Sequence, residues 1–283
     1  MKPVSKLSFK PAGKEILPQP RPAFPVRLDL GSKPAVPSVK ATVRNALPLS
    51  EFSARSASPM VLRQGLGMDS LAVRMRMVHK LAAQGITDAQ VLAALGKVER
   101  HRFVDTALAN QAYEDTSLPI GLGQTISKPS VVARMLELAQ QGVRDASGRL
   151  GRVLEIGTGC AYQVAVLSYL ATEVYSMERL RGLHDKARDN LRPFRLANVH
   201  LLFGDGMVGY AKGAPYAAII AAAGGEAIPG AWVEQLAMGG RLVAPMQVGH
   251  GAQALVVIDK TRHGIRQTVL EAVHFVPLKS GTS

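Results

Sequence analysis

The chain has 283 residues, of which 47% are hydrophobic, 19% charged and 5% aromatic. This composition supports one large domain or two small ones, and no apolar run approaches the roughly 20 residues that cross a bilayer. No apolar segment follows the basic first ten residues, which argues against a secretory signal. The single cysteine, Cys160, excludes an intrachain disulfide framework and a four-thiolate zinc site. We expect a reducing, cytoplasmic setting, no membrane association and no metal site.

The positive charge is concentrated near the N-terminus. The net charge is +13 (34 − 21), and residues 1–60 hold ten Lys or Arg against three acids, together with ten of the 17 prolines. Proline removes a backbone donor and disfavours helix at the preceding residue. We therefore expect residues 1–64 to form a basic, largely disordered extension and residues 65–283 to form the folded domain. A solvated tail is the favoured interpretation of the extension, ahead of a weak electrostatic contact with nucleic acid.

The folded domain is predicted to begin with helices. Asp69 can cap a helix that runs to about residue 84, and Thr87 or Asp88 begins a second helix. A short third helix is expected at 104–110, followed by an irregular stretch over 113–127. Ser127 is a good N-cap for a helix to about residue 140, since Pro129 is tolerated in a first helical turn.

From residue 152 the pattern alternates between strands and helices. Strands are expected at 152–156, 173–177, 199–203, 216–221, 241–245, 254–259 and 268–276, and helices at 161–171, 180–191 and 231–236. Such alternation predicts an α/β fold with a mostly parallel central sheet and helices on both faces. The last two strands are close enough in sequence to form an antiparallel pair.

A glycine-rich turn follows the first strand of this series. Gly157 and Gly159 allow the backbone to approach a ligand closely, and the amides at the start of the next helix face it. Glu178 ends the second strand, 19 residues beyond Gly159, where a carboxylate can accept hydrogen bonds from both ribose hydroxyls. This spacing is shared by nicotinamide dehydrogenases and S-adenosylmethionine methyltransferases.

Three further residues favour the methyltransferases. Glu155 would be unfavourable near a pyrophosphate but suits the ammonium end of S-adenosylmethionine. Tyr162 occupies the place of the third glycine of the dehydrogenase pattern. Asp205, in Gly204-Asp205-Gly206 after the third strand, is placed to accept from an adenine amino group. We expect the three carboxylates to meet in one crevice at the strand ends.

The acceptor is expected to bring its own nucleophile. Amino-methylating enzymes of nucleic acids usually place Asn or Asp and two prolines after the fourth strand, where this chain has Ala221-Ala222-Ala223-Gly224-Gly225-Glu226. Cys160 lies in the glycine turn, so it is not placed to attack a base. A carboxylate acceptor is already ionised at neutral pH and needs no base.

Residues 114–129, Glu-Asp-Thr-Ser-Leu-Pro-Ile-Gly-Leu-Gly-Gln-Thr-Ile-Ser-Lys-Pro, closely resemble the signature of the protein-L-isoaspartate O-methyltransferase family. The glycine turn, residues 174–179, 204–206, 239–245 and 275–278 resemble the same family in its order. The resemblance covers about 65–283. It implies a Rossmann-like class I methyltransferase fold with extra N-terminal helices and a C-terminal antiparallel strand pair.

The resemblance also implies a reaction. A family member methylates the free α-carboxylate of L-isoaspartyl residues in damaged proteins and peptides, and repair follows through a succinimide. S-adenosylmethionine is the methyl donor and S-adenosylhomocysteine the product. We expect a monomer that acts on isoaspartyl-containing proteins. A methyltransferase with a changed acceptor, such as RNA or a small molecule, and a cofactor-binding protein with weakened activity are the alternatives.

The site residues follow from the turn and the resemblance together. Ser127 matches the proposed catalytic serine, whose hydroxyl is expected to orient the carboxylate. The expected cofactor-binding residues are Thr125, Ile126, Glu155, Gly157, Gly159, Tyr162, Glu178, Asp205 and Gly206. The expected substrate-binding residues are Ile120, Thr125, Ala222 and Ala223.

The chain departs from the family pattern at four places. Cys160-Ala161 replaces Ser-Gly, which would weaken cofactor binding if Ala161 needs a positive φ. Lys128 adds a cation near an anionic acceptor. Gly224-Gly225 lacks a proline, which is expected to loosen that loop, and His274 replaces a frequent arginine. None of these changes removes an essential chemical group.

Overall fold

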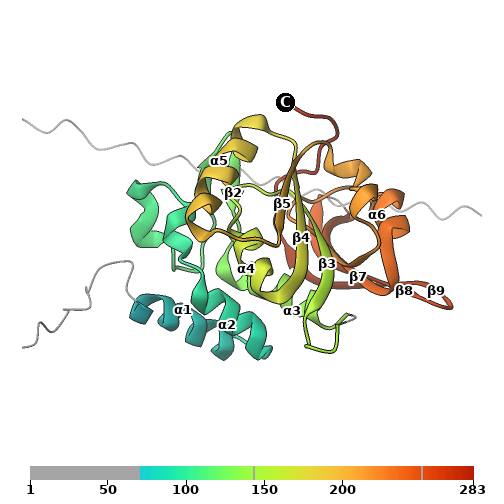
Figure 1. Ribbon diagram of the computed structural model, residues 1–283, viewed down its shortest axis with the longest axis horizontal. Coiled ribbons are helices and arrows are strands. Elements are labelled where there is room, and N and C mark those ends of the chain that lie inside the picture. The colour runs from blue at the N-terminus through green and yellow to red at the C-terminus, as the bar shows by residue number, and fades with distance from the viewer. Residues whose placement is uncertain (1–70, 143, 250) are drawn as a thin grey trace, which may run out of the picture. The chain divides into compact units, whose positions relative to one another are not determined.

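The structure, a computed structural model, describes residues 71–142, 144–249 and 251–283 (Figure 1). These residues belong to one unit of the chain, 61–283. The expected disordered extension over 1–64 and the expected helix cap at Asp69 lie outside the described residues. None of the described helices combines the length and the apolar character needed to cross a membrane.

Helices occupy the segments that the sequence predicts, with small shifts at their ends. The α-helices are α1 (Leu71–Ala83), α2 (Ala89–Lys97), α3 (Pro129–Gln140), α4 (Tyr162–Leu170), α5 (Arg181–Leu191) and α6 (Gly230–Gln235). Short 3₁₀ helices are η1 (Arg100–Phe103), η2 (Thr106–Gln111), η3 (Arg192–Phe194), η4 (Gly206–Val208) and η5 (Ala211–Gly213). The short third helix expected at 104–110 is therefore η2, and η1 precedes it.

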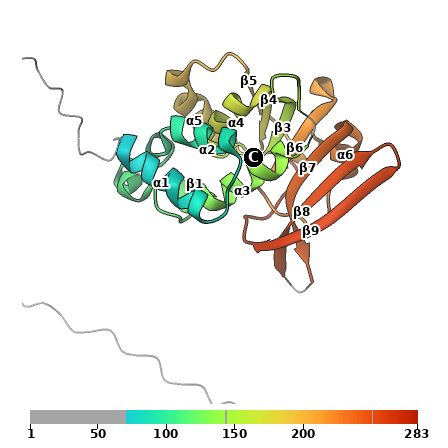
Figure 2. The ribbon, with the colours of Figure 1, turned by 90° about the horizontal axis from the view of Figure 1, so that it is seen from below.

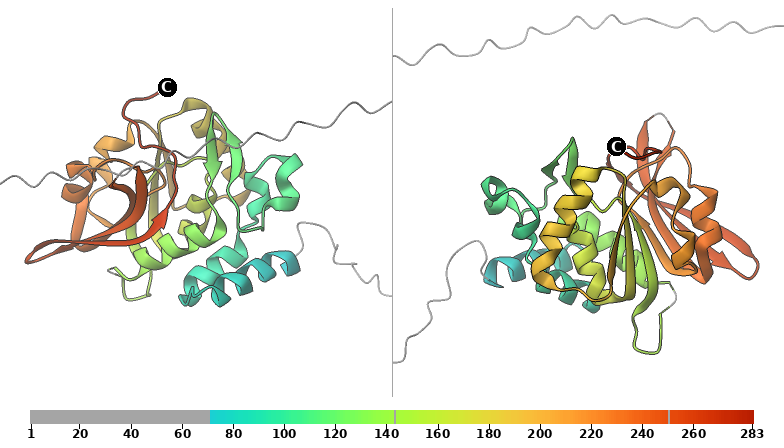
Figure 3. Two further views of the ribbon diagram at one scale, coloured as in Figure 1. Left: turned by 180° about the vertical axis from the view of Figure 1, so that it is seen from behind. Right: turned by 45° about the horizontal axis from the view of Figure 1, so that its top comes forward.

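The central sheet has seven strands in the order β5-β4-β3-β6-β7-β8-β9. Their bounds are β3 (Leu150–Ile156), β4 (Ala171–Glu178), β5 (Val199–Phe203), β6 (Tyr216–Ala221), β7 (Leu236–Val248), β8 (Ala252–Thr261) and β9 (Gly264–Val273). Strands β3 to β7 pair in parallel, and β8 and β9 add antiparallel strands at one edge (Figure 3). The predicted mostly parallel sheet and its antiparallel C-terminal pair are confirmed.

Apolar side chains from alternate positions of the strands form two cores, one on each face of the sheet. Val153, Ala218 and Val243 pack with the helices of the first core, α1 to α5. Leu154 and Ile219 pack on the other face, where Trp232 of α6 is buried. Figure 2 shows α6 on the side of the sheet opposite α3 and α4. Burial on both faces explains why the strands are continuous apolar runs.

The stretch 113–127, expected to be irregular, contains a β-hairpin. Its strands are β1 (Leu118–Gly121) and β2 (Gln124–Ile126), paired antiparallel. The turn between them needs left-handed backbone, with φ of 99° at Gly121, 51° at Leu122 and 69° at Gly123. Strands of four and three residues are too short for alternation to show in the sequence, so the pattern did not predict them.

The expected capping of α3 by Ser127 is wrong. The N-cap residue is Lys128, which forms no side-chain capping bond, and Pro129 is the first helical residue. The helix amide of Ser130 donates instead to Asp115 Oδ1 at 2.9 Å. A side chain from a distant part of the chain therefore caps α3, and the Ser127 side chain is not needed for that purpose.

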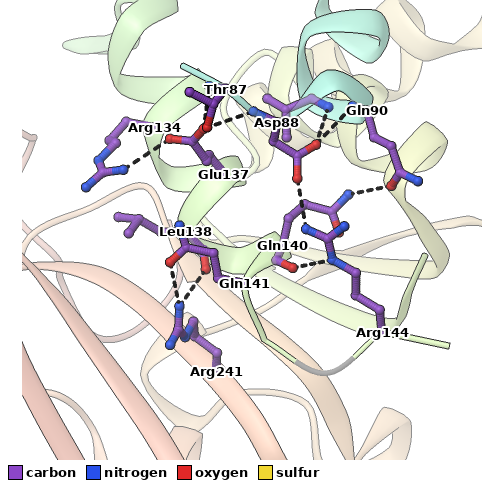
Figure 4. A network of polar contacts seen from close by, with 11 residues as sticks. Thr87, Asp88, Gln90, Arg134, Glu137, Leu138, Gln140, Gln141, Arg144 and Arg241 are labelled. Carbon is purple, nitrogen blue, oxygen red and sulfur yellow. Dashed lines mark hydrogen bonds and ion pairs between the residues drawn. The ribbon is translucent and has the colours of Figure 1, made fainter. Parts of the chain in front are cut away.

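A buried carboxylate ties the C-terminal half of α3 to the start of α2 (Figure 4). Glu137 is 4% exposed, and its Oε1 accepts from the Thr87 amide at 2.7 Å, the Asp88 amide at 3.0 Å and the Thr87 hydroxyl at 3.1 Å. Its Oε2 accepts from Arg134 at 3.1 Å. These contacts fix α3, whose N-terminal end adjoins Ser127, against the helices that precede it.

Candidate functional site

A cavity of about 480 Å³ opens where β3, β4 and β6 end. Its walls are the β1–β2 hairpin with Ser127, the glycine turn after β3, the end of β4, two alanines after β6, and the segment Val276–Lys279. Of the residues assigned from the sequence, those that line this cavity are Ile120, Thr125, Ile126, Ser127, Glu155, Gly157, Gly159, Tyr162, Glu178, Gly206, Ala222 and Ala223. Asp205 does not line it.

The glycine turn has the left-handed backbone that the ligand-binding interpretation requires. The φ angle is 90° at Gly157 and 56° at Gly159. A Cβ at Gly159 would lie 3.2 Å from Ile120 Cδ1, so this turn packs directly against the hairpin. Ala161 also has a positive φ, 70°, and is completely buried. The sequence predicts weaker cofactor binding if Ala161 needs a positive φ, and the structure meets that condition. An alanine with this backbone conformation is strained.

Glu155 is a buried acid with an unsatisfied oxygen. The residue has no exposed surface, and its Oε2 accepts from the Ser176 hydroxyl at 2.5 Å. Thr158 Oγ1 lies 2.7 Å from the same hydroxyl, whereas Glu155 Oε1 forms no hydrogen bond of ordinary geometry with a described residue. Burial raises the pKa of Glu155 to about 8, with a smaller contribution from Glu178, while the Ser176 and Gln163 side chains act in the opposite direction. A cation bound beside this carboxyl group would favour its ionised form.

Glu178 links the glycine turn to the end of β4. Its Oε2 accepts from the Gly159 amide and its Oε1 from the Leu180 amide, both at 2.9 Å. The side chain is nearly buried and lines the cavity. Each carboxylate oxygen can accept a further bond, so the same group that fixes the turn remains able to accept hydroxyl hydrogens.

Asp205 is not among the residues that line the cavity. Its Oδ1 accepts from the Met207 amide at 2.8 Å, and its Oδ2 accepts from the Gly281 amide at 2.7 Å. Arg179 Nε also donates to the Gly281 carbonyl, at 2.9 Å. Of the three carboxylates expected to meet at the strand ends, Glu155 and Glu178 line the cavity, and the Asp205 carboxylate holds the Met207 and Gly281 amides.

The hairpin and Ser127 form the opposite wall. Ile126 is buried, Thr125 is exposed, and the Ser127 side chain forms no hydrogen bond with another described residue. The Ser127 carbonyl accepts from Arg100 Nη2 at 2.7 Å. Lys128, the added cation, is exposed beside this wall but does not line the cavity. A hydroxyl without an internal partner is available to a bound acceptor.

The segment after β9 was missed by the residue assignments, although it is part of the wall. Val276, Pro277, Leu278 and Lys279 line the cavity. Main-chain bonds tie this segment to Gly224, whose amide donates to the Val276 carbonyl at 2.9 Å and whose carbonyl accepts from the Leu278 amide at 2.8 Å. The loop at Gly224-Gly225 is therefore held in place, contrary to the expected loosening.

The sequence assignments also missed further residues on the side of the cavity expected to bind the methyl donor. Thr158, Gln163 and Met177 line the cavity beside the assigned residues. Thr158 stands between the two glycines and Gln163 follows Tyr162, so both were adjacent to a recognised motif. Met177 gave no chemical signal because it is an apolar residue near the end of a strand.

The residues present fit S-adenosylmethionine. The cavity has a buried acid with a free oxygen, a turn without side chains, and a carboxylate at the end of β4. These groups suit an ammonium or sulfonium cation, a close approach of backbone and a ribose. Across the described ranges, no group of three or more His, Cys, Asp or Glu is placed to hold a metal ion.

Comparisons with known proteins identify the family. The family model for protein-L-isoaspartate(D-aspartate) O-methyltransferase matches residues 72–283. The protein-L-isoaspartate O-methyltransferase of Methylibium petroleiphilum is 56% identical over 270 residues, which cover 93% of this chain and 98% of the relative. That of Leptothrix cholodnii is 58% identical over 238 residues, covering 83% of each protein.

Solved structures give the same result for the fold. A protein-L-isoaspartate O-methyltransferase structure superposes with a TM-score of 0.64 and 25% identity, covering 73% of this chain and 66% of the other. A putative member from Plasmodium falciparum, solved with S-adenosyl-L-homocysteine, has a TM-score of 0.61 and 23% identity, covering 73% of this chain and 98% of the other. With a matching family model over most of the chain and relatives more than half identical, this chain belongs to the protein-L-isoaspartate(D-aspartate) O-methyltransferase family.

Proposed function

We propose that this chain transfers a methyl group from S-adenosylmethionine to the free α-carboxylate of L-isoaspartyl residues in damaged proteins and peptides. The observation that supports the proposal most directly is the shape of one cavity. Glu155, the glycine turn and Glu178 lie along one wall, and the unpartnered hydroxyl of Ser127 lies on another. The two reactants can therefore meet inside a single enclosure.

When bound, S-adenosylmethionine supplies an electrophilic methyl on a cationic sulfur. A carboxylate oxygen of the acceptor forms the new C–O bond as the C–S bond breaks, and the neutral thioether S-adenosylhomocysteine departs. Opposite charges cancel along this path, so exclusion of water and alignment of the reacting atoms supply most of the acceleration. The reaction needs no base from the protein because the acceptor is already ionised.

The roles of the chain's residues follow from their positions. Glu155 pairs with the ammonium group of the donor, and Glu178 accepts from its ribose while holding the turn at Gly159. Ser127 donates its hydroxyl hydrogen to the acceptor carboxylate and orients it. Ile120 and the alanines at 222 and 223 form the apolar surface that excludes water around the acceptor.

A pair of matched peptides tests the proposal. The chain is incubated with donor labelled in the methyl group and with an isoaspartyl peptide or its aspartyl counterpart. We expect base-labile label on the isoaspartyl peptide alone, because an ester is cleaved by base. Equal labelling of the two peptides, or label only on an RNA acceptor, would overturn the repair function in favour of a changed acceptor. Tight donor binding without any product would indicate a binding protein of the same fold.

A variant separates orientation from binding. Replacing Ser127 with Ala removes the hydroxyl and leaves the carbonyl that Arg100 contacts. We expect turnover to fall while the Kd for S-adenosylhomocysteine, measured by calorimetry, stays near the value of the unmodified chain. A fall in affinity without a fall in turnover would reverse the assigned role.

We propose that the protein acts as a monomer on protein substrates, because the described residues of one chain are sufficient to form the cavity of about 480 Å³. Sedimentation equilibrium of the active protein is expected to give the mass of one chain, 30.1 kDa. Activity confined to a dimer fraction would contradict this.

A further inference from the structure

Arg100 is a buried cation without an ion-pair partner among the described residues. It contacts Ser127 and Tyr162, which both line the cavity. Its exposed fraction is 0%. Burying a charge is unfavourable unless other groups compensate, and an arginine cannot escape by losing its proton under ordinary conditions. Burial lowers the pKa of its guanidinium, while Tyr162 and Asp115 act in the opposite direction. The unfavourable burial of the Arg100 guanidinium suggests that this charge has a function.

The contacts of Arg100 are main-chain carbonyls from two different segments. Its Nε donates to the Ala112 carbonyl and its Nη2 to the Ser127 carbonyl, each at 2.7 Å. The planar guanidinium fixes both directions at once, which a flexible ammonium cannot do. Its remaining nitrogen, Nη1, is buried and has no hydrogen-bond partner among the described residues. The side chain therefore bridges the segment before the hairpin to Ser127.

Arg100 also contacts the cofactor half of the cavity. Its guanidinium lies 4.7 Å from the centroid of the Tyr162 ring, a cation–π distance. Phe103, from the same short helix η1, meets that ring edge-on with centroids 5.6 Å apart. Tyr162 begins α4 directly after the glycine turn, which is the wall expected to bind the donor. The Arg100 side chain therefore contacts both this donor wall and the acceptor wall, which is formed by the hairpin and Ser127.

The segment from Ser127 to Ser130 is thus held at each end by a charged side chain. Arg100 binds the carbonyl at its start, and Asp115 accepts from the amide at its end. Neither bond uses the Ser127 hydroxyl. The backbone of Ser127 is fixed by groups outside the cavity, and its side chain stays available inside it.

We propose that Arg100 is a positioning residue for methyl transfer, which sets the Ser127 hydroxyl against the donor wall by holding the Ser127 carbonyl while its guanidinium packs on the Tyr162 ring. This inference rests on the proposed function for its kinetic readout. It adds a residue that touches neither reactant and acts through Ser127. A misplacement of about 1 Å at such a group can slow a reaction by up to about 100-fold.

The test compares substitutions of two buried arginines. Arg100→Met keeps the length of the apolar stem and removes both carbonyl contacts. Arg74→Met is the matched control, since Arg74 is 9% exposed, donates to the Gly96 carbonyl at 2.7 Å and does not line the cavity. We expect Arg100→Met to lower kcat for the isoaspartyl peptide between about 10- and 100-fold, with the Kd for S-adenosylhomocysteine changed less than about threefold. Arg74→Met is expected to lower the melting temperature with little change in kcat.

A second variant keeps the proposal testable if Arg100→Met does not fold. Arg100→Lys retains the charge but places all its donors on one nitrogen, so it is expected to recover part of kcat by reaching one of the two carbonyls. Amide hydrogen exchange of residues 124–130 supplies a readout independent of turnover. It is expected to accelerate in the Arg100 variants and to remain unchanged in Arg74→Met.

The outcomes separate this inference from the proposed function. An unmodified chain that does not methylate the isoaspartyl peptide would end the proposed function, and hydrogen exchange would still decide the role of Arg100. Equal kcat losses in Arg100→Met and Arg74→Met would overturn the positioning role. So would unchanged exchange at residues 124–130, or a loss of cofactor affinity as large as the loss of turnover.

Discussion

The amide of Ser130 donates to the carboxylate of Asp115, 15 residues earlier, rather than to the nearby Ser127. This relationship frees a hydroxyl that would otherwise cap α3. Ser127 is well suited to capping by residue type, yet the cap position belongs to Lys128 and the capping acceptor comes from the other side of the hairpin. One structural bond therefore decides whether the side chain is used for folding or for chemistry.

Replacing Asp115 with Ala is expected to lower both stability and turnover. Loss of the cap costs about 1 kcal/mol, and the free Ser130 amide then competes for the Ser127 hydroxyl. Asp105→Ala is the control, because Asp105 caps η2 by accepting from the Ala107 amide at 3.1 Å. Urea unfolding and peptide kinetics should show a stability loss in both variants and a kcat loss only in the first. A kcat unchanged by Asp115→Ala would contradict the argument.

Ala161 offers a stabilising substitution. Its φ of 70° is unfavourable by about 1 kcal/mol for a residue with a Cβ and costs glycine nothing. We expect Ala161→Gly to raise the unfolding free energy by about 0.5 kcal/mol or more, after the larger entropy of an unfolded glycine is deducted. Ala165→Gly, inside α4, is the control and is expected to destabilise by about 1 kcal/mol. Equal destabilisation by the two changes would show that the strain is relieved elsewhere.

The regular parts of this fold could be predicted from the sequence, because local patterns determine them. The bounds of β5 and β6 coincide with the predicted strands at 199–203 and 216–221. The prediction shortened β7 because Gly239 and Gly240 interrupt its apolar run. The β1–β2 hairpin is too short for periodicity to reveal it.

The site was predictable as a set of motifs but not as a set of contacts. Glu155 and Glu178 reach the cavity because the carboxyl ends of parallel strands meet at one edge of the sheet. Asp205 obeys the same rule in sequence, yet the Gly281 amide, 76 residues later, binds its carboxylate. Arg100 carries no sequence signal at all, since its partners are main-chain carbonyls. Long-range partners of this kind become visible only in the folded chain.

Glu137 predicts an acid-sensitive component of stability. Burial opposes its ionisation, but the Thr87 and Asp88 amides, the Thr87 hydroxyl and Arg134 outweigh that effect and lower its pKa from 4.5. The stabilisation is therefore complete above about pH 4.5 and is lost as the pH falls through the lower folded pKa. We expect Glu137→Gln to cost about 2 kcal/mol at pH 7, and the difference to shrink toward pH 3.

The control for this variant uses the same arginine. Glu271 accepts from Arg134 Nε at 2.8 Å, but its side chain is 45% exposed. Glu271→Gln is expected to cost less than about 1 kcal/mol, as surface ion pairs do. Chemical denaturation at several pH values measures both. A Glu137→Gln penalty that stays constant from pH 7 to pH 3 would contradict the ionised state assigned here.

Glu155 predicts the opposite pH dependence. Its pKa of about 8 means that the acid is mostly protonated in the empty site at pH 7. A raised folded pKa removes stability as pH increases from about 4.5 to about 8, so Glu155→Gln is expected to stabilise the protein progressively over that interval. The same change is expected to weaken cofactor binding, because the cation loses its counter-charge.

Calorimetry in buffers of different ionisation enthalpy measures the linked proton. A cation that ionises Glu155 is expected to release between about 0.5 and 1 proton per site at pH 7. S-adenosylmethionine and S-adenosylhomocysteine share the ammonium group, so equal release with both identifies that group as the partner. Release with S-adenosylmethionine alone would assign Glu155 to the sulfonium, and no release from either ligand would refute the buried protonated acid.

Gly224 and Gln253 predict a thermodynamic coupling. The Gln253 amide group accepts from the Phe275 amide at 2.7 Å and donates to the Phe275 carbonyl at 3.3 Å, which holds the start of the segment that lines the cavity. We call these two bonds between Gln253 and Phe275 the clamp. A Cβ at Gly224 would lie 2.6 Å from Gln253 Nε2, so an alanine at Gly224 displaces the Gln253 side chain and breaks the clamp. We expect Gly224→Ala and Gln253→Ala each to cost about 1–2 kcal/mol and to weaken S-adenosylhomocysteine binding.

The double variant distinguishes a shared cause from two separate ones. Once Gln253 is Ala, the space beside Gly224 is open, and adding a methyl there breaks no further bond. Gly224→Ala is therefore expected to cost almost nothing in the Gln253→Ala background, whereas independent sites would add. Additive losses would show that Gly224 acts through its own backbone rather than through the clamp.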